Sequence, residues 1–213
     1  MYSRFFKRFL DFILSLTALI VLFPILLILT VIGALAMKGN PFFVQPRPGK
    51  KGKNGKERIF KLIKLRTMSN AKDKEGNLLP DEVRLNKYGR FLRSTSLDEL
   101  PELLNILKGD MSIVGPRPER VEHVEEYSRE IPEFNYRTKV KGGLTGYAQV
   151  YGKYNTTPYD KLKLDLTYIE NYSFLLDIKL MLLTLKAMFE PENTEGIAAW
   201  QTTAAKDTTN KKG

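Results

Sequence analysis

The chain has no cysteine and a single histidine among its 213 residues. Without cysteine, disulfides, thiol nucleophiles and cysteine–zinc sites are excluded from this chain. One histidine, His123, leaves little room for a Ser-His-Asp arrangement, so acid–base chemistry would fall to carboxylates, lysine or tyrosine. His123 lies in a charged stretch from Glu119 to Glu130 that has helical character. We interpret it as a solvated surface residue.

Acidic residues are also in deficit. There are 24 Asp and Glu against 34 Lys and Arg, which gives a formal net charge of +10. Such an excess favours an anionic partner, either nucleic acid or an anionic lipid surface. The run from Phe9 to Met37 is apolar apart from Asp11 and a few hydroxyls. It exceeds the ~20 residues that a bilayer-spanning helix needs. We therefore expect membrane lipids as partners and no nucleic acid.

Two features argue against a simple membrane crossing. Pro24 lies within the apolar run, where it removes a hydrogen bond to the carbonyl of Ile20 and would kink a helix. Basic residues flank both ends of the run, and the positive-inside tendency would hold both on the cytoplasmic face. They are Arg4, Lys7 and Arg8 before it, and Lys38, Arg47, Lys50, Lys51 and Lys53 after it. We expect a re-entrant helix-break-helix with Pro24 as the membrane hinge.

A cleavable signal peptide is the competing interpretation of the same run. Ala34-Leu35-Ala36 resembles a cleavage site. The apolar stretch is, however, too long for the apolar region of a signal peptide, and the basic stretch that follows is unusual for an exported N-terminus. We therefore prefer the membrane anchor.

The segment from Ser94 to Glu119 is the centre of the sequence. Four leucines recur in it at helical spacing, namely Leu97, Leu100, Leu104 and Leu107. Gly109 supplies a C-terminal stop for this helix. Ser96 with Glu99 matches a capping box, but Pro101 would then lie where a hydrogen-bond donor is required. With Asp98 as N-cap, Pro101 falls in the first turn, where no donor is needed. We predict this later start, which places both carboxylates at a phosphate-attracting helix N-terminus.

Two carboxylates at a helix start also have a purely structural interpretation, because Asp is a good N-cap and Glu a good first-turn residue. The residues around these two carboxylates favour a catalytic role over the structural one. A short apolar strand, Met111 to Val114, leads into Gly115-Pro116-Arg117-Pro118, a rigid turn that fixes one guanidinium, and Arg93 lies just upstream. Carboxylates, arginines and a helix N-terminus together suit a phosphate-handling site with a divalent cation.

These motifs closely resemble those of the bacterial sugar transferases, the monotopic phosphoglycosyl transferases that begin the assembly of cell-surface glycans. The resemblance rests on Ser96–Pro101, Asn105, Leu107–Ser112 and Gly115–Pro118, and it covers roughly residues 1 to 190. It implies transfer of a sugar 1-phosphate from a UDP-sugar to polyprenol (undecaprenyl) phosphate, with release of UMP. It also implies a location at the cytoplasmic face of the bacterial inner membrane.

The resemblance assigns roles to individual residues. Asp98 would be the nucleophile that carries a covalent phospho-sugar, and Glu99 would assist with the required Mg²⁺, for which both carboxylates are candidate ligands. Arg93 and Arg117 would stabilise phosphoryl charge. The stretch after the turn, Glu119 to Val124, is more similar to hexose 1-phosphate transferases of exopolysaccharide pathways, which favours glucose or galactose.

Four further phosphate- or substrate-binding candidates come from two other motifs. Lys64 and Thr67 belong to Lys64–Met68, which resembles a basic motif of the family and which would end a strand with two cations and a hydroxyl. Gln149 belongs to a glycine-punctuated segment from Lys141 to Val150 that also resembles the family, and Lys153 follows it. Gln149 is an amide suited to a sugar or nucleotide, and Lys153 is a weaker phosphate candidate.

The predicted fold is therefore a mixed α/β, monotopic membrane protein. It comprises the re-entrant helix (1–38), a small cytoplasmic and interfacial catalytic domain (39–190) and a disordered tail (191–213). Within the domain we expect a hairpin turning at Asn54-Gly55, a helix from Glu82 to Arg93, and two late helices from Thr157 and Leu175, the last suited to the bilayer interface. The alternative from another class is a non-catalytic, membrane-anchored scaffold that binds anionic lipids, which would have no need of paired carboxylates beside arginines.

Overall fold

A computed structural model describes residues 2–52, 58–152 and 156–189. In chain order the elements are η1 Tyr2–Phe6, α1 Lys7–Ala36, β1 Phe42–Pro48, β2 Ile59–Leu65, α2 Asp81–Arg84, α3 Lys87–Thr95, η2 Leu97–Glu99, α4 Glu102–Lys108, β3 Ser112–Val114, α5 Val121–Glu130, η3 Pro132–Lys139, β4 Gly143–Thr145, α6 Tyr147–Tyr151, α7 Pro158–Asn171 and α8 Phe174–Phe189. This confirms a small mixed α/β protein with a long apolar N-terminal helix. The expected turn at Asn54-Gly55 and the tail 191–213 lie outside the described residues.

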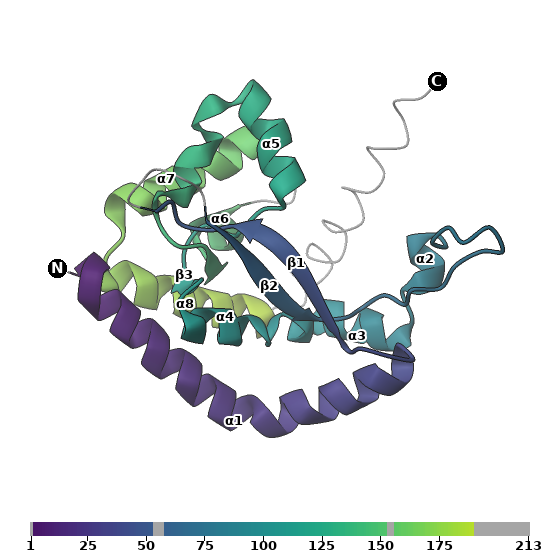
Figure 1. Ribbon diagram of the computed structural model, residues 1–213. Coiled ribbons are helices and arrows are strands. Elements are labelled where there is room, and N and C mark those ends of the chain that lie inside the picture. The colour runs from purple at the N-terminus through teal and green to yellow at the C-terminus, as the bar shows by residue number, and fades with distance from the viewer. Residues whose placement is uncertain (1, 53–57, 153–155, 190–213) are drawn as a thin grey trace.

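Helix α1 is apolar and long enough for a membrane span by length and composition, and most of its central surface is exposed. It runs beneath the rest of the protein and bends near its middle (Figure 1). Pro24 lies inside it without ending it. The expected break into two helices is therefore not seen, since a proline removes one hydrogen bond and bends a helix whose other bonds persist.

Both ends of α1 are attached to the same globular part of the chain. In its first half, the Asp11 carboxylate accepts hydrogen bonds from the Ser112 hydroxyl and the Ile113 amide, each 3.0 Å long. In its second half, the Tyr88 hydroxyl donates to the carbonyl of Leu29 at 2.6 Å. The bonds to Asp11 explain how an acidic residue is tolerated in an apolar run, because a buried carboxylate is stable only when its oxygens have partners.

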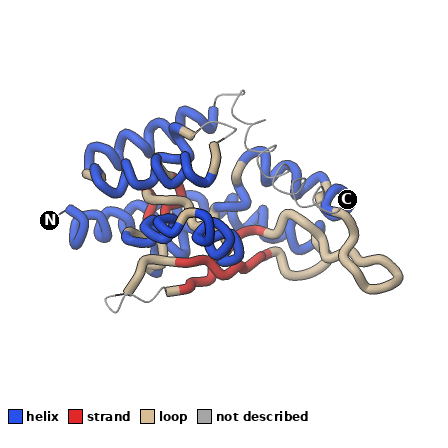
Figure 2. The backbone as a smooth tube through the Cα atoms, turned by 90° about the horizontal axis from the view of Figure 1, so that it is seen from above, coloured by secondary structure: helices blue, strands red, loops and turns tan. Residues whose placement is uncertain are grey.

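The two strand pairs differ in direction. Strands β1 and β2 form an antiparallel hairpin in which Phe42 pairs with Leu65 and Pro48 with Ile59, as expected from the sequence. Strands β3 and β4 pair in parallel, Ser112 opposite Gly143. A parallel pair needs a long crossover connection, which α5 and η3 provide. Figure 2 shows the long hairpin apart from the short pair, which is enclosed by helices.

The core places α4 between α1 and the hairpin. Leu103 and Ile106 of α4 pack with Phe60 and Leu62 of β2, and Leu19 of α1 covers the same cluster. Further clusters lie around β3 and beneath α5, with Val114, Tyr168 and Leu180 in the first and Val124, Phe134 and Leu162 in the second. Helix α4 is thus held on both sides, which fixes the residues at its N-terminal end.

Two predictions about helices met different outcomes. The helix expected from Glu82 to Arg93 is two helices, because the backbone at Leu85 is extended and the Asn86 side chain caps α3 by accepting from the Gly89 amide at 2.8 Å. The start predicted at Thr157 is confirmed: Thr157 and Asp160 form a capping box at the N-terminus of α7.

Candidate active site

The backbone around Asp98 differs from the sequence prediction. Helix α3 ends at Ser96, which adopts a left-handed conformation (φ 55°) and donates its amide to the carbonyl of Arg93. Asp98 then lies in the short 3-10 turn η2, and α4 begins at Glu102 after Pro101 without a side-chain cap. The assignment of Asp98 as N-cap is therefore wrong. The chain turns sharply at Ser96 instead, and the turn presents Asp98 and Glu99 just before α4.

Glu99 is the centre of an ion-pair cluster. Both terminal nitrogens of Arg117 donate to its carboxylate, with 3.0 Å between Nη1 and Oε2, and Lys64 Nζ lies 2.7 Å from Oε1. All three side chains are largely withdrawn from solvent. Burial acts to raise the pKa of Glu99, but the charges of Arg117 and Lys64 outweigh it and hold the pKa well below its usual range. Glu99 is therefore anionic and is paired with two cations, Arg117 and Lys64.

Asp98 is the carboxylate left without a partner. It is 7% exposed, and among the described residues nothing donates a hydrogen bond to it. Burial, opposed in part by Lys64, raises the pKa of Asp98 to about 6, and the negative charge of Glu99 contributes to the rise. The charges of Arg117 and Arg93 act in the opposite direction. A buried, unpaired oxygen nucleophile with three cations around it is what attack on a phosphate requires.

Arg93 and Thr67 complete one side of this cluster. The Arg93 Nε donates to the Thr67 hydroxyl at 3.1 Å, which joins the C-terminal end of α3 to the end of β2. Burial lowers the pKa of Arg93, while the nearby Asp98 charge raises it. The structure thus brings together six of the eight catalytic and binding residues predicted from the sequence, namely Lys64, Thr67, Arg93, Asp98, Glu99 and Arg117.

Of the other two predicted residues, only Gln149 is described by the structure. Gln149 lies on α6, and its amide donates to the carbonyl of Leu144 at 3.0 Å. Among the described residues no hydrogen bond joins it to either carboxylate, so its role as a substrate ligand stays a prediction. Lys153 lies outside the described residues.

One member of the cluster was missed by the sequence analysis. Glu102, the first residue of α4, is 1% exposed, and its Oε1 lies 3.2 Å from Lys64 Nζ without hydrogen-bonding geometry. Burial and the charge of Glu99 raise the pKa of Glu102 to about 7. Lys64 therefore bridges two carboxylates. An acidic residue in a first helical turn is common, so only the position of Lys64 in space reveals this one.

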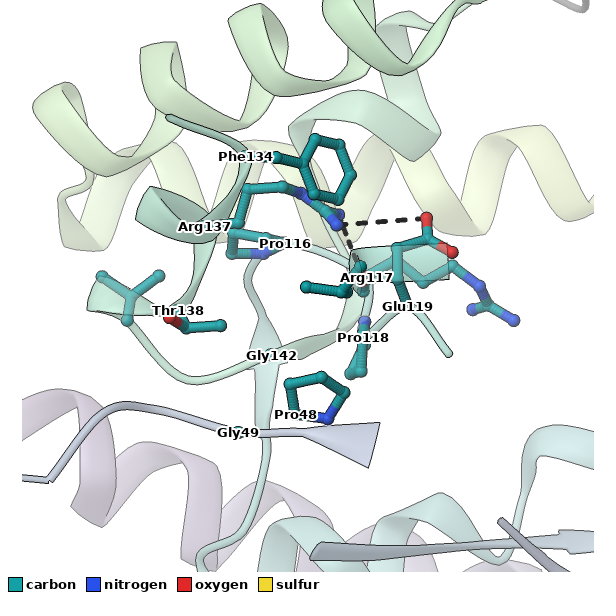
Figure 3. A pocket seen from close by; sticks show the side chains of 12 residues that line it. Pro48, Gly49, Pro116, Arg117, Pro118, Glu119, Phe134, Arg137, Thr138 and Gly142 are labelled. Carbon is teal, nitrogen blue, oxygen red and sulfur yellow. Dashed lines mark hydrogen bonds and ion pairs between the residues drawn. The ribbon is translucent and has the colours of Figure 1, made fainter. Parts of the chain in front are cut away.

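Two other arginines bind the backbone of the turn that carries Arg117. Arg137 Nη2 donates to the carbonyl of Arg117 and Arg47 Nη1 to that of Pro118, each at 2.8 Å. Figure 3 shows Arg137 reaching this turn across a small pocket that lies behind it. Arg137 also forms a buried salt bridge with Asp165 of α7, with 2.6 Å between Nε and Oδ2. The Arg117 side chain consequently extends from a fixed backbone.

The residues at this site are compatible with a magnesium ion. Within the described ranges no three His, Cys, Asp or Glu side chains are arranged to hold a metal by themselves. Mg²⁺ at phosphate-handling sites is, however, usually held by one or two carboxylates together with substrate phosphates. Asp98 offers such a carboxylate, since its oxygens are unpaired, whereas Glu99 is already bound by Arg117 and Lys64. Of the two ligands predicted from the sequence, Asp98 is the better placed.

Comparison with known proteins agrees with these observations. The family model described as bacterial sugar transferase matches residues 2–191. The chain is 43% identical over 184 residues to the uncharacterized sugar transferase EpsL of Bacillus subtilis, with 86% of this chain and 85% of that one covered.

It is also 42% identical over 185 residues to the UDP-glucose:undecaprenyl-phosphate glucose-1-phosphate transferase of Klebsiella pneumoniae, with 84% and 39% covered. A third relative, 33% identical over 189 residues, is the UDP-N-acetylgalactosamine-undecaprenyl-phosphate N-acetylgalactosaminephosphotransferase of Aeromonas hydrophila, with 86% and 44% covered. The chain thus spans less than half of these two longer relatives. Both of these relatives are named as enzymes, which favours the transferase over the scaffold. The chain belongs to the bacterial sugar transferase family and is an enzyme of the transferase class.

Proposed function

We propose that the enzyme is a phosphoglycosyl transferase that moves a sugar 1-phosphate from a UDP-hexose to polyprenol phosphate. The observation that carries the proposal is the buried, unpaired Asp98 beside Glu99, which holds Arg117 and Lys64. The names of relatives from Klebsiella pneumoniae and Escherichia coli supply the substrates, a UDP-sugar and undecaprenyl phosphate. Among sugars, UDP-glucose is the first donor to test, and this extends the sequence-based preference for glucose or galactose.

The reaction would proceed in two displacements at one phosphorus atom. An Asp98 oxygen attacks the sugar-bearing phosphorus of the UDP-sugar, an O–P bond forms, and the bond from that phosphorus to the bridging oxygen breaks. UMP leaves with the bridging oxygen and its electron pair. An oxygen of polyprenol phosphate then attacks the same phosphorus and Asp98 is released, which yields the polyprenyl-diphospho-sugar. A carboxylate suits this chemistry because its acyl phosphate remains reactive.

The basic side chains compensate charge during both displacements. Arg117 uses two of its five N–H donors on Glu99, so three remain for phosphate oxygens. Lys64 and Arg93 lie close enough to Asp98 to act on its charge. Held by Asp98 and the substrate diphosphate, Mg²⁺ would supply further neutralisation of the phosphate charge. Glu99 would thus act mainly by fixing the two cations.

We also propose that α1 enters and leaves the bilayer on one side. Its N-terminal half is bonded to β3 through Asp11, and its C-terminal half is bonded to α3 through Leu29. A straight crossing would carry one of these attachments to the opposite side of the membrane. Positive residues at both ends favour the cytoplasmic face of the bacterial inner membrane, where polyprenol phosphate would reach the site from the bilayer.

The reaction is tested with purified protein in detergent and a panel of UDP-sugars, with UMP release measured with Mg²⁺ and with a chelator. We expect Mg²⁺-dependent UMP release with at least one UDP-hexose. Asp98→Asn should abolish release, and Asp73→Asn, a carboxamide substitution in the polar loop outside the cluster, should leave it unchanged. Absence of UMP release across the panel would favour the anionic-lipid scaffold.

The topology is tested with single cysteines, because the chain has none of its own. Cysteines placed at Ser3 and Lys74 should both resist a membrane-impermeant thiol reagent in intact cells and react after the cells are lysed. Labelling at one position alone would mean that α1 crosses the bilayer. Pro24→Ala restores the missing helical hydrogen bond and should shift the protein toward crossing. Unchanged topology and activity in this variant would show that Pro24 is not the hinge.

A further inference from the structure

A second hollow lies at the opposite end of α4 from the carboxylate cluster. Its volume is about 270 Å³ and its polar lining is almost entirely basic, with Lys50, Lys51, Arg58 and Lys141 against the single carboxylate of Asp110. Helix α4 has seven residues, which at ~1.5 Å each separates the two sites by about 10 Å. The hollow is therefore distinct from the proposed reaction centre. We refer to it as the basic hollow.

The charge of the basic hollow is not balanced within the protein. Asp110 is paired with Arg58 at 3.2 Å. Lys141 is half-buried, and among the described residues no carboxylate or hydrogen-bond acceptor pairs with its side chain. Burial and the like charges of Arg8 and Lys50 lower the pKa of Lys141, although the charges of Asp11 and Asp110 act in the opposite direction. A partly desolvated ammonium without a partner costs free energy, which a bound anion would recover.

The walls of the basic hollow are fixed by backbone hydrogen bonds. The Gly49 amide donates to the carbonyl of Arg58 at 2.8 Å, which closes the loop end of the hairpin, and the Lys51 amide donates to the carbonyl of Thr138 at 3.0 Å. These bonds position the adjoining lysines before a ligand arrives. Preorganisation of this kind reduces the entropic cost of binding.

The basic hollow also adjoins the membrane helix. Arg8 of α1 donates to the carbonyls of Ile106 and Leu107 at the end of α4, at 2.6 and 2.7 Å. Three phenylalanines are exposed near this end of α1, with exposed fractions of 85% and 66% for Phe5 and Phe6 of η1 and 60% for Phe9 of α1. Exposed apolar aromatic side chains next to cations are typical of helices that lie in the membrane interface.

We propose that the basic hollow binds the phosphodiester headgroup of an anionic membrane phospholipid, with Lys50 and Lys141 as its main contacts. This rests on the membrane placement of α1 proposed above and is independent of the reaction at Asp98. Clusters of four to eight basic residues next to a membrane segment bind anionic lipids by the same electrostatics. The headgroup would anchor the N-terminal half of α1 and the loop end of the β1–β2 hairpin at one level in the membrane.

The test measures lipid binding and not turnover. Full-length protein in detergent micelles is titrated with phosphatidylglycerol or phosphatidylcholine, and bound lipid is measured by native mass spectrometry. We expect preferential binding of phosphatidylglycerol and a weakening of about tenfold in Lys50→Gln/Lys141→Gln. The matched control, Lys74→Gln/Lys163→Gln, removes two exposed lysines elsewhere and should bind as the wild type does.

Other results of the lipid-binding experiment would contradict the proposal. Equal affinity for phosphatidylcholine, or unaltered binding by the double variant, would overturn it. Displacement of the lipid by an equal concentration of inorganic phosphate would show a site for free phosphate and overturn the lipid assignment. If the double variant does not fold, two single variants test the proposal instead. Lys50→Gln, at an exposed position, should weaken lipid binding, and the charge-conserving Lys141→Arg should retain it. Lost UMP release with intact lipid binding would refute only the proposed reaction.

Discussion

Replacing Arg117 by lysine separates charge from geometry at the proposed reaction centre. Arg117 holds Glu99 through two N–H groups and leaves others for phosphate. Lysine keeps the charge but offers a single point contact. One charge-assisted hydrogen bond contributes about 1.5–3 kcal/mol, and each 1.36 kcal/mol corresponds to tenfold in rate. We therefore expect Arg117→Lys to lose roughly tenfold to hundredfold in turnover.

The assay is steady-state UMP release with the same preparation's thermal unfolding measured in parallel. The fold should persist, because Arg137 and Arg47 hold the turn through backbone carbonyls and not through the Arg117 side chain. A transition-state contact predicts equal losses in kcat and kcat/KM. Arg129→Lys, on the exposed side of α5, is the matched control. Near-normal kcat/KM in Arg117→Lys would make Arg117 a structural residue and refute the reasoning.

Two other substitutions follow from the packing around the site. The folded-state pKa of Glu102, about 7, lies above its ordinary value of 4.5, so its ionisation reduces stability progressively as pH rises between these values and fully above pH 7. Glu102→Gln should therefore have a higher melting temperature than the wild type at pH 8, and this difference should shrink toward pH 5. The exposed Glu126→Gln should show no such trend. A difference in melting temperature that does not depend on pH would contradict the raised pKa of Glu102. A Cβ on Gly89 would lie 1.8 Å from the carbonyl oxygen of Thr67, so Gly89→Ala should lower both the melting temperature and UMP release by moving α3 from the end of β2. Gly39→Ala, where an added Cβ meets nothing within 4 Å, should change neither, and equal effects of the two substitutions would argue against this contact.

Much of the fold could be predicted from local patterns. The β1–β2 hairpin, the strand before Gly115 and the start of α7 depend on alternation, turn residues and capping, which act over a few positions. The start of α4 could not be predicted in this way. The comparison of Ser96 with Asp98 as caps treated one helix by itself, whereas Ser96 already ends α3 in a left-handed conformation. The competing upstream helix decided the geometry.

The candidate site was predictable only as separate pieces. Local spacing indicated the paired carboxylates and Arg117, and family resemblance added Lys64 and Thr67. The contact between Lys64 and Glu99 joins residues 35 positions apart, and the burial of Glu102 arises only when β2 packs on α4. Neither follows from a period or a motif. Asp11 is similar: an acidic residue in an apolar run is explained by the amide and hydroxyl of β3 that bind it.

The central claim is that Asp98 carries the sugar phosphate between two substrates. It is tested most directly by the intact mass of the protein after incubation with a UDP-sugar and Mg²⁺ and without lipid acceptor. The wild type should gain the mass of one sugar phosphate, mapped to Asp98 and removed on addition of polyprenol phosphate. Asp98→Asn should gain nothing while remaining folded. An adduct at another residue, or continued turnover by Asp98→Asn, would contradict the account.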